Sequence, residues 1–186
     1  MYSTLQRLNN VTALATSVIM ILLSLVSLTT LVLPARVEPS SLKLNHINVL
    51  FGRSNYDRTV RAREYAFAKF DVIADLSPMF NWNTKQIFVY LRADYQTGDY
   101  ASRTGFALPA NSVVLWDRIV RGKRFARINI ADGKQKYEFK EITNSFKNVS
   151  AVFSLQYQVQ PYVGLLMDGS LVQTEAIVLP PAQRRT

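Results

Sequence analysis

The feature that most constrains this chain is an uncharged, apolar run near its N-terminus. From Val11 to Leu33 there are 23 consecutive residues without a charged side chain, and 16 of them are apolar. As a helix, with a rise of about 1.5 Å per residue, the run reaches roughly 35 Å, which is enough to cross a hydrocarbon core of about 30 Å. Its serine and threonine hydroxyls can bond to carbonyls of the helix itself. The run therefore predicts a transmembrane helix at residues 11–33, after a short segment at residues 1–10.

An apolar run near an N-terminus can also be a cleaved signal peptide or a buried helix. The apolar core of a signal peptide usually spans only about 7–15 residues. The best cleavage site, at Leu33-Pro34-Ala35, lacks a small residue three positions before the cut and contains a proline. A helix that is apolar on every side would need a much larger protein to bury it. The sequence favours an uncleaved anchor.

The charges beside the run leave its orientation open. Arg7 and the α-amino group precede it, and Arg36, Glu38 and Lys43 follow it. Because positive flanks favour the cytosolic side, this comparison is close to a tie. Features within residues 34–186 must therefore decide which side that part of the chain occupies.

The residues after the anchor alternate between apolar and polar side chains, as β-strands do. The clearest runs are residues 66–76, 85–95 and 149–160, and shorter ones are 42–51, 113–120, 125–130, 136–142 and 170–179. About eight strands with turn signals at short spacing predict an antiparallel β-sandwich. The expected fold is mainly β: one transmembrane helix, then a β-sandwich domain within residues 34–186, with a short tether before it and a polar tail from residue 180.

Local irregularities are expected in and between these strands. The apolar parity of the 42–51 run changes in its middle, which predicts a β-bulge near Asn45-His46. Asp132-Gly133 stands between apolar runs and predicts a hairpin turn. Phe88 and Tyr90 lie on the second face of the 85–95 run, so that strand is expected to be covered on both sides. Residues 79–86 allow a short helical turn.

The inventory of reactive side chains argues against an enzyme. The chain has no cysteine, which excludes disulfides, thiolate metal sites and a cysteine nucleophile. His46 is the single histidine, so a multi-histidine zinc site is excluded, and no G-x-S-x-G sequence occurs. Asp71 and Asp75 on one strand would lie roughly 13 Å apart, beyond the about 5–9.5 Å of glycosidase carboxylates. We expect no metal, cofactor or catalytic residue, although counting alone leaves a serine with His46 or with a lysine open.

The chain is strongly basic, with 22 lysines and arginines against 13 acidic residues and a net charge of +9. Such a charge suits nucleic acid or an anionic membrane. The densest cluster brackets a turn and consists of Arg118, Arg121, Lys123, Arg124 and Arg127. A domain tethered to a membrane rarely meets nucleic acid. The cluster is therefore interpreted as a solvated turn, with lipid headgroups or an acidic partner as the alternatives.

Two N-x-[ST] sequons bear on the orientation. The sequon at Asn10 abuts the transmembrane run, where glycosylation enzymes could hardly reach it. Asn148 begins the 149–160 strand on its polar parity and is expected to face outward. An N-glycan at Asn148 predicts a lumenal or extracellular C-terminal domain and a cytosolic N-terminus.

Two stretches of the chain carry a family resemblance. They read Phe70-Asp71-Val72-Ile73-Ala74-Asp75-Leu76, then Phe80, Trp82-Asn83, Lys85-Gln86, Phe88, Tyr90-Leu91, Ala93 and Tyr95, and Val113-Val114-Leu115-Trp116-Asp117-Arg118-Ile119-Val120. Together with one anchor and a late sequon, they strongly resemble the signal peptidase complex subunit 3 family. The likeness extends over nearly the whole chain and is weakest at residues 96–112 and 134–147.

The resemblance implies a non-catalytic subunit of the endoplasmic-reticulum signal peptidase. Members of the family cross the membrane once, with a cytosolic N-terminus and a lumenal domain. They support a separate catalytic serine protease subunit that cleaves signal peptides from nascent secretory chains. The implied partners are that subunit, the other subunits of the complex and the lipid bilayer.

The candidate contact residues for the catalytic partner are Trp82, Asn83, Lys85, Trp116 and Asp117. Trp82 lies in a polar turn, where tryptophan has less to pack against, and tryptophan is enriched in interface hot spots. Trp116 shares its strand parity with Val114, which favours ordinary core packing. An edge strand of the sandwich could instead pair with the partner through main-chain bonds.

Two other functions remain open on the sequence. One is a membrane-tethered hydrolase that uses a serine with His46 or with a lysine. The other is an anchored sandwich that binds carbohydrate or peptide. Identifying what co-purifies with the chain separates both from the subunit hypothesis.

Overall fold

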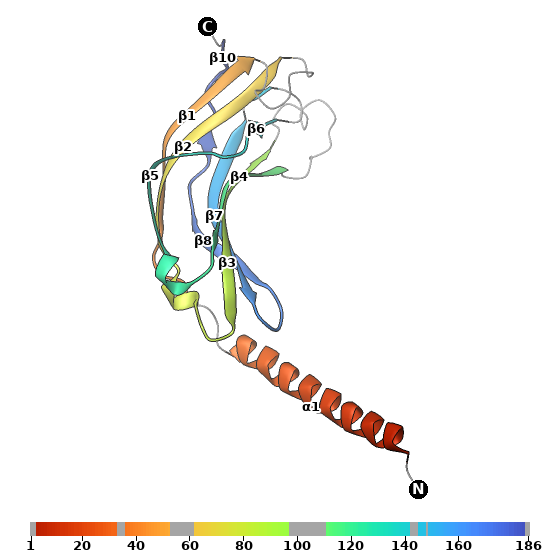
Figure 1. Cartoon of the computed structure of the whole chain (residues 1–186). Coiled ribbons are helices and arrows are strands. Elements are labelled where there is room, and N and C mark those ends of the chain that lie inside the picture. The colour runs from red at the N-terminus through yellow and green to blue at the C-terminus, as the bar shows by residue number, and fades with distance from the viewer. Residues whose placement is uncertain are drawn as a thin grey trace.

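The computed structural model describes residues 3–32, 36–52, 62–96, 111–141, 145–147 and 149–184. Helix α1 (Thr4–Val32) projects from one end of a β-sandwich (Figure 1). This helix is long and apolar enough to cross a membrane, and none of its most apolar window is buried against the rest of the chain. Its hydroxyls bond back to the helix as expected: Ser17 Oγ donates to Ala13 O and Ser24 Oγ to Met20 O, both at 2.9 Å.

The sandwich consists of two five-stranded sheets. The first has the order β10 (Gln183–Arg184), β1 (Ser41–Gly52), β2 (Arg63–Asp75) and β5 (Arg127–Lys134), with β6 (Phe139–Lys140) also paired to β2. The second has the order β4 (Asn111–Val120), β3 (Thr84–Gln96), β7 (Ser150–Pro161) and β8 (Met167–Gln173), with β9 (Ile177–Val178) also paired to β7. Among these described strands, every pair is antiparallel except β1 with β10. The expected fold class is confirmed.

The core lies between the two sheets and follows the alternation of the sequence. In β2 and the residue after it, the inward side chains are all at most 3% exposed: Ala66, Ala68, Phe70, Val72, Ala74 and Leu76. In and just before β7 they are at most 9% exposed: Val149, Ala151, Phe153, Leu155, Tyr157 and Val159. The centre of the core is aromatic, because Phe70 meets the Trp116 ring edge-on with centroids 5.9 Å apart. Burial of these two faces against each other is the main stabilising contribution.

The β-bulge expected near Asn45-His46 is present, because the register of β1 against β2 shifts between Leu44 and His46. The prediction of a hairpin turn at Asp132-Gly133 is wrong. β5 runs through both residues and stays paired to β2, whose partners shift in register between Phe70 and Val72.

The physical reason is a side chain of β2. The Asp71 carboxylate accepts a hydrogen bond of 2.6 Å from the Asp132 backbone N–H, and this bond holds the pKa of Asp71 below its usual value. Asp132 takes a positive φ of 51°, which forms a bulge in place of a turn. A Cβ at Gly133 would lie 2.5 Å from Ile130 Cγ2 and 3.2 Å from the Phe70 carbonyl, so only glycine lets β5 rejoin the ladder.

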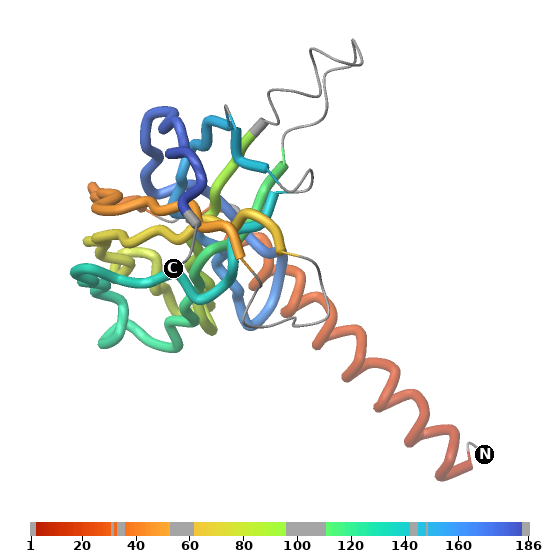
Figure 2. Tube along the Cα trace, turned by 90° about the horizontal axis from the view of Figure 1, so that it is seen from above, coloured from red at the N-terminus to blue at the C-terminus, as the bar shows by residue number. Residues whose placement is uncertain are grey.

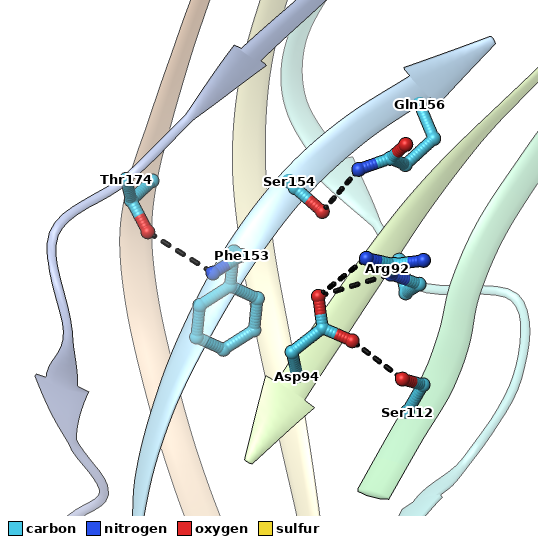
Figure 3. A network of polar contacts seen from close by, with 7 residues as sticks. All are labelled: Arg92, Asp94, Ser112, Phe153, Ser154, Gln156 and Thr174. Atoms are coloured by element: carbon cyan, nitrogen blue, oxygen red, sulfur yellow. Dashed lines mark hydrogen bonds and ion pairs between the residues drawn. The ribbon is translucent and has the colours of Figure 1, made fainter. Parts of the chain in front are cut away.

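Other elements differ from the expected ranges. The short helical turn lies at η1 (Ser77–Met79), before the expected 79–86. The expected 125–130 strand begins only at Arg127, because η2 (Lys123–Phe125) precedes it. The 136–142 strand shrinks to β6, and the 170–179 strand divides into β8 and β9. The division occurs at Thr174, whose Oγ1 accepts from the Phe153 N–H at 3.1 Å (Figure 3).

Candidate functional site

Three segments meet where α1 joins the sandwich (Figure 1). They are the C-terminal end of α1, the connection from β2 to β3 at residues 76–83, and the hairpin loop from β7 to β8 at residues 162–166. We call this region the junction. Figure 2 shows from a second direction that α1 leaves the junction on the side of the second sheet.

Asn83 joins all three segments. Its side chain is buried, with the residue 3% exposed. The amide Nδ2 donates to Thr30 Oγ1 at 2.9 Å and to the Val163 carbonyl at 2.7 Å, and Oδ1 accepts from the Val163 N–H at 3.2 Å. Because these bonds occupy both ends of the amide, Asn83 ties helix and sandwich together and is a positioning residue.

The hairpin loop approaches α1 closely at Gly164. This residue has a φ of +117°, which glycine adopts without strain. A Cβ at this position would lie 3.0 Å from Ser27 Oγ and 3.4 Å from Ser27 Cα. The backbone of the loop therefore packs directly on the helix.

Trp82 stands out from the junction with 63% of its surface exposed. The turn that carries it is held by Asn81, whose Oδ1 accepts from the Asn83 N–H at 3.0 Å and whose carbonyl accepts from the Thr84 N–H at 3.1 Å. The Asn83 carbonyl accepts from the Tyr162 N–H at 2.8 Å. A large aromatic side chain on a fixed backbone loses little conformational entropy when it binds, which suits an interface anchor.

Trp116 lies inside the sandwich and is only 8% exposed. The register of β3 against β4 shifts between Leu91 and Arg92, which turns both Leu115 and Trp116 inward and leaves Val114 37% exposed. Trp116 is therefore a core residue, as its sequence favoured, but it does not share the orientation of Val114.

Asp117 lies partly exposed at the edge of the second sheet. Its carboxylate Oδ1 accepts from Lys136 Nζ and from the Tyr137 hydroxyl, each at 3.0 Å. Burial would raise the pKa of Asp117, but these two bonds outweigh it and the pKa is lowered.

Lys85 is exposed at the start of β3. Of the five candidate contact residues, Trp82, Lys85 and Asp117 thus reach the surface, whereas Asn83 and Trp116 are buried.

The outer face of the second sheet is partly exposed, so the expectation that the 85–95 strand is covered on both sides is wrong: Phe88 and Tyr90 lie at the surface. Figure 1 shows that the sandwich is curved and that this face lies on its concave side. Along β3, Phe88 stacks on Tyr90 with centroids 5.3 Å apart, and Arg92 pairs with Asp94 at 2.8 Å. Asp94 also accepts from Ser112 Oγ at 2.6 Å, as Figure 3 shows.

The neighbouring strand β7 adds amides to this surface. Gln156 Nε2 donates to Ser154 Oγ at 3.0 Å, and Gln86 and Gln160 lie in contact across β3 and β7. We call this surface the concave face. Its exposed or partly exposed residues are Gln86, Phe88, Tyr90, Arg92, Asp94, Ser112, Gln156, Gln158 and Gln160, and Ser154 is buried beneath them. The alternation in the sequence and the aromatic Phe88 and Tyr90 were the signals for it, but neither reveals which face of a sheet is concave.

The remaining candidates lie outside the junction, although the turn at η2 adjoins it, because the Leu76 N–H donates to the Ala126 carbonyl at 3.0 Å. His46 is exposed on the β1 bulge. Arg121, Lys123 and Arg124 are exposed around η2, and Arg127 pairs with Asp75 at 3.2 Å. Asn148 lies outside the described residues. Within the described ranges, no three histidine, aspartate or glutamate side chains are grouped closely enough to hold a metal ion.

Comparison with known proteins decides the family. A family model described as signal peptidase subunit matches residues 1–182. The chain belongs to the signal peptidase subunit family. The match covers both the helix and nearly all of the sandwich, so the resemblance inferred from the two sequence stretches is confirmed.

Individual relatives agree with this family. Signal peptidase complex subunit 3 of Saccharomyces cerevisiae is 39% identical over 127 residues, covering 68% of this chain and 65% of the relative. The protein of that name from Gallus gallus is 39% identical over 104 residues, covering 55% and 53%. Adipocyte-related X-chromosome expressed sequence 1 of Mus musculus is 33% identical over 167 residues, covering 89% and 87%. The chain spans 65%, 62% and 54% of the length of the relatives from S. cerevisiae, Yarrowia lipolytica and Debaryomyces hansenii.

Proposed function

We propose that this chain is a non-catalytic subunit of the endoplasmic-reticulum signal peptidase complex and holds the catalytic serine protease subunit. The observation that carries the proposal is the family match over residues 1–182. Several relatives bear the name signal peptidase complex subunit 3. The chain itself has a helix that can cross the membrane, a β-sandwich and an exposed tryptophan, Trp82, that can bind a partner. A subunit that holds another membrane protein needs these parts.

The proposed arrangement places α1 across the endoplasmic-reticulum membrane, with residues 1–10 cytosolic and residues 34–186 lumenal. The proposed contact with the catalytic subunit begins at Trp82 and Lys85 and continues along the concave face. That face offers both stacked aromatic rings and hydrogen-bonding amides, and it lies on the side toward which α1 leaves the junction (Figure 1). A second subunit with its own membrane anchor can therefore lie beside α1 and still meet the face. Asp117 lies at the rim of the second sheet, while Trp116 supports the sheet from inside.

Co-purification tests the proposal. The full chain, extracted in mild detergent, is expected to carry a serine protease subunit in stoichiometric amount, and the pair is expected to cleave a signal peptide that the chain alone does not cleave. Hydrolysis by the isolated chain would instead support the tethered hydrolase. Retention on a glycan or peptide matrix without any protease would support the binding sandwich.

The orientation is tested in sealed microsomes. Protease added outside is expected to leave residues from about 34 onward intact until detergent opens the membrane, because the proposed lumen shields them. That fragment is also expected to carry one N-glycan, at Asn148, so glycosidase should increase its gel mobility.

Two variants serve as controls for the glycan. Asn148→Gln should abolish the mobility change, whereas Asn10→Gln should leave it intact, because Asn10 lies within α1. Digestion of the fragment without detergent would refute the orientation. A mobility change that persists in Asn148→Gln would refute the site.

A further inference from the structure

The hairpin loop between β7 and β8 ends in apolar side chains that the chain leaves uncovered. Tyr162, Leu165 and Leu166 are 67%, 69% and 57% exposed. Residues 161–167 contain no charged side chain, and Asp168 is the first charge after them. An exposed pair of leucines beside an exposed tyrosine is unusual on a surface that faces only water.

The contact between the loop and α1 shows how deep the loop would lie in a membrane that α1 crosses. Gly164 packs on Ser27, which lies five residues before the end of α1 at Val32. At about 1.5 Å per residue, Ser27 lies roughly 8 Å along the axis from that end. A hydrocarbon core of about 30 Å, centred on the uncharged run at residues 11–33, would extend to about residue 32. The loop therefore lies beside a part of the helix that is inside the boundary of the hydrocarbon.

The loop cannot slide away from this depth without breaking the junction. Asn83 bonds both to Thr30 on α1 and to Val163 in the loop. Burial of backbone groups in lipid limits insertion, because unpaired N–H and C=O groups have no partner there. A shallow insertion satisfies both constraints: leucines enter the acyl region while the tyrosine, an interfacial residue, stays at headgroup level.

We propose that residues 162–166 form a lipid-inserting loop, with Leu165 and Leu166 in the outer acyl region of the leaflet at the C-terminal end of α1. This inference rests on the proposed membrane crossing of α1. The loop and the helix together give the sandwich two points of attachment to one leaflet, which restrains its tilt. The apolar side chains of the loop are thus covered by the same bilayer that surrounds α1.

The natural absence of cysteine makes the test direct, because each variant carries a single label. An environment-sensitive fluorophore is attached to Leu165→Cys, Ser17→Cys or Glu175→Cys, and the full chain is reconstituted alone in phosphatidylcholine vesicles. Some vesicles contain phospholipids with a spin label near the top of an acyl chain, and others contain the spin label near its end. Iodide in the water measures exposure to solvent.

The label at Leu165→Cys is expected to be quenched several-fold more by the shallow spin label than the label at Glu175→Cys, and to be shielded from iodide. Glu175 is exposed beyond the far end of β8, about 23 Å of strand from the loop, and should show the opposite behaviour. Ser17→Cys, five residues from the centre of the uncharged run at residues 11–33, should be quenched by both spin labels and shielded from iodide.

Three outcomes would overturn the inference. If Leu165→Cys responds to iodide as Glu175→Cys does, while Ser17→Cys is still quenched by lipid, the helix crosses the membrane and only the loop is wrong. If Ser17→Cys is not quenched by lipid, the proposed membrane arrangement fails together with the loop. If Leu165→Cys becomes shielded only when the catalytic subunit is added, the loop binds protein and not lipid.

Discussion

Replacing Phe70 by alanine is expected to lower the free energy of unfolding of the sandwich by about 3–5 kcal/mol. Phe70 is fully buried on β2 and packs edge-on against Trp116 of the opposite sheet. Alanine would leave a cavity between the sheets, and the surrounding strands are held in register on both sides. Because domains of this size are stable by only about 5–15 kcal/mol, much of the total stability would be lost.

The measurement is denaturant unfolding of the full chain in detergent micelles, followed by tryptophan fluorescence, to which the buried Trp116 contributes the larger change because Trp82 is already exposed. Phe125→Ala is the matched control, because Phe125 is 56% exposed and its loss should change the free energy by no more than about 0.5 kcal/mol. Equal losses in the two variants would show that Phe70 is not in the packed centre of the core.

Replacing Trp82 by alanine is expected to weaken binding of the catalytic subunit about 30-fold, which corresponds to a hot-spot loss of about 2 kcal/mol. Trp82 is 63% exposed on a turn whose backbone is held by Asn81 and Asn83, so the variant should keep its fold. In cells that lack the natural protein, uncleaved secretory precursors should accumulate. Co-purification and the fraction of uncleaved precursor are the two measurements, and glycosylation and protease resistance check the fold.

His46→Ala is the matched control for this variant. His46 is exposed on the β1 bulge, away from the junction, and its replacement should change neither assembly nor cleavage. If the catalytic subunit co-purifies normally with the Trp82→Ala variant, Trp82 is not part of the interface. Loss of cleavage in His46→Ala, with assembly and folding intact, would replace the holding role by a catalytic one.

Local periodicity was enough to predict the elements that bury one continuous face. The uncharged run gave α1, and the alternation in residues 66–76 and 149–160 gave β2 and β7 with the correct inward side chains. The change of parity at Asn45-His46 gave the bulge. These elements could be predicted because each is determined by the side chains of its own segment. The period of a helix or strand and its apolar content do not depend on which strands lie beside it.

Asp132-Gly133 shows where local reasoning fails. As a pair it favours a hairpin turn, but the Asp71 carboxylate, 61 residues away in sequence, bonds the Asp132 N–H and keeps β5 in the sheet. The short strand β10 has the same origin, since its pairing with β1 is not visible in a polar tail. Such outcomes depend on which strands become neighbours, and the sequence pattern of one segment does not contain that information.

The candidate site also has a part that the sequence predicted and a part that only the tertiary structure shows. Residue type and context in the sequence singled out the turn around Trp82, and the structure places Trp82 at the surface. The same reasoning treated Asn83 as a contact residue, whereas its amide is used in holding Thr30 and Val163. The sequence alone thus determined an apolar span, a mainly β domain and the family of the chain. The tertiary structure alone decided which polar side chains are buried between segments and which apolar ones remain uncovered, because burial and hydrogen-bond partners are set by contacts between residues distant in the sequence.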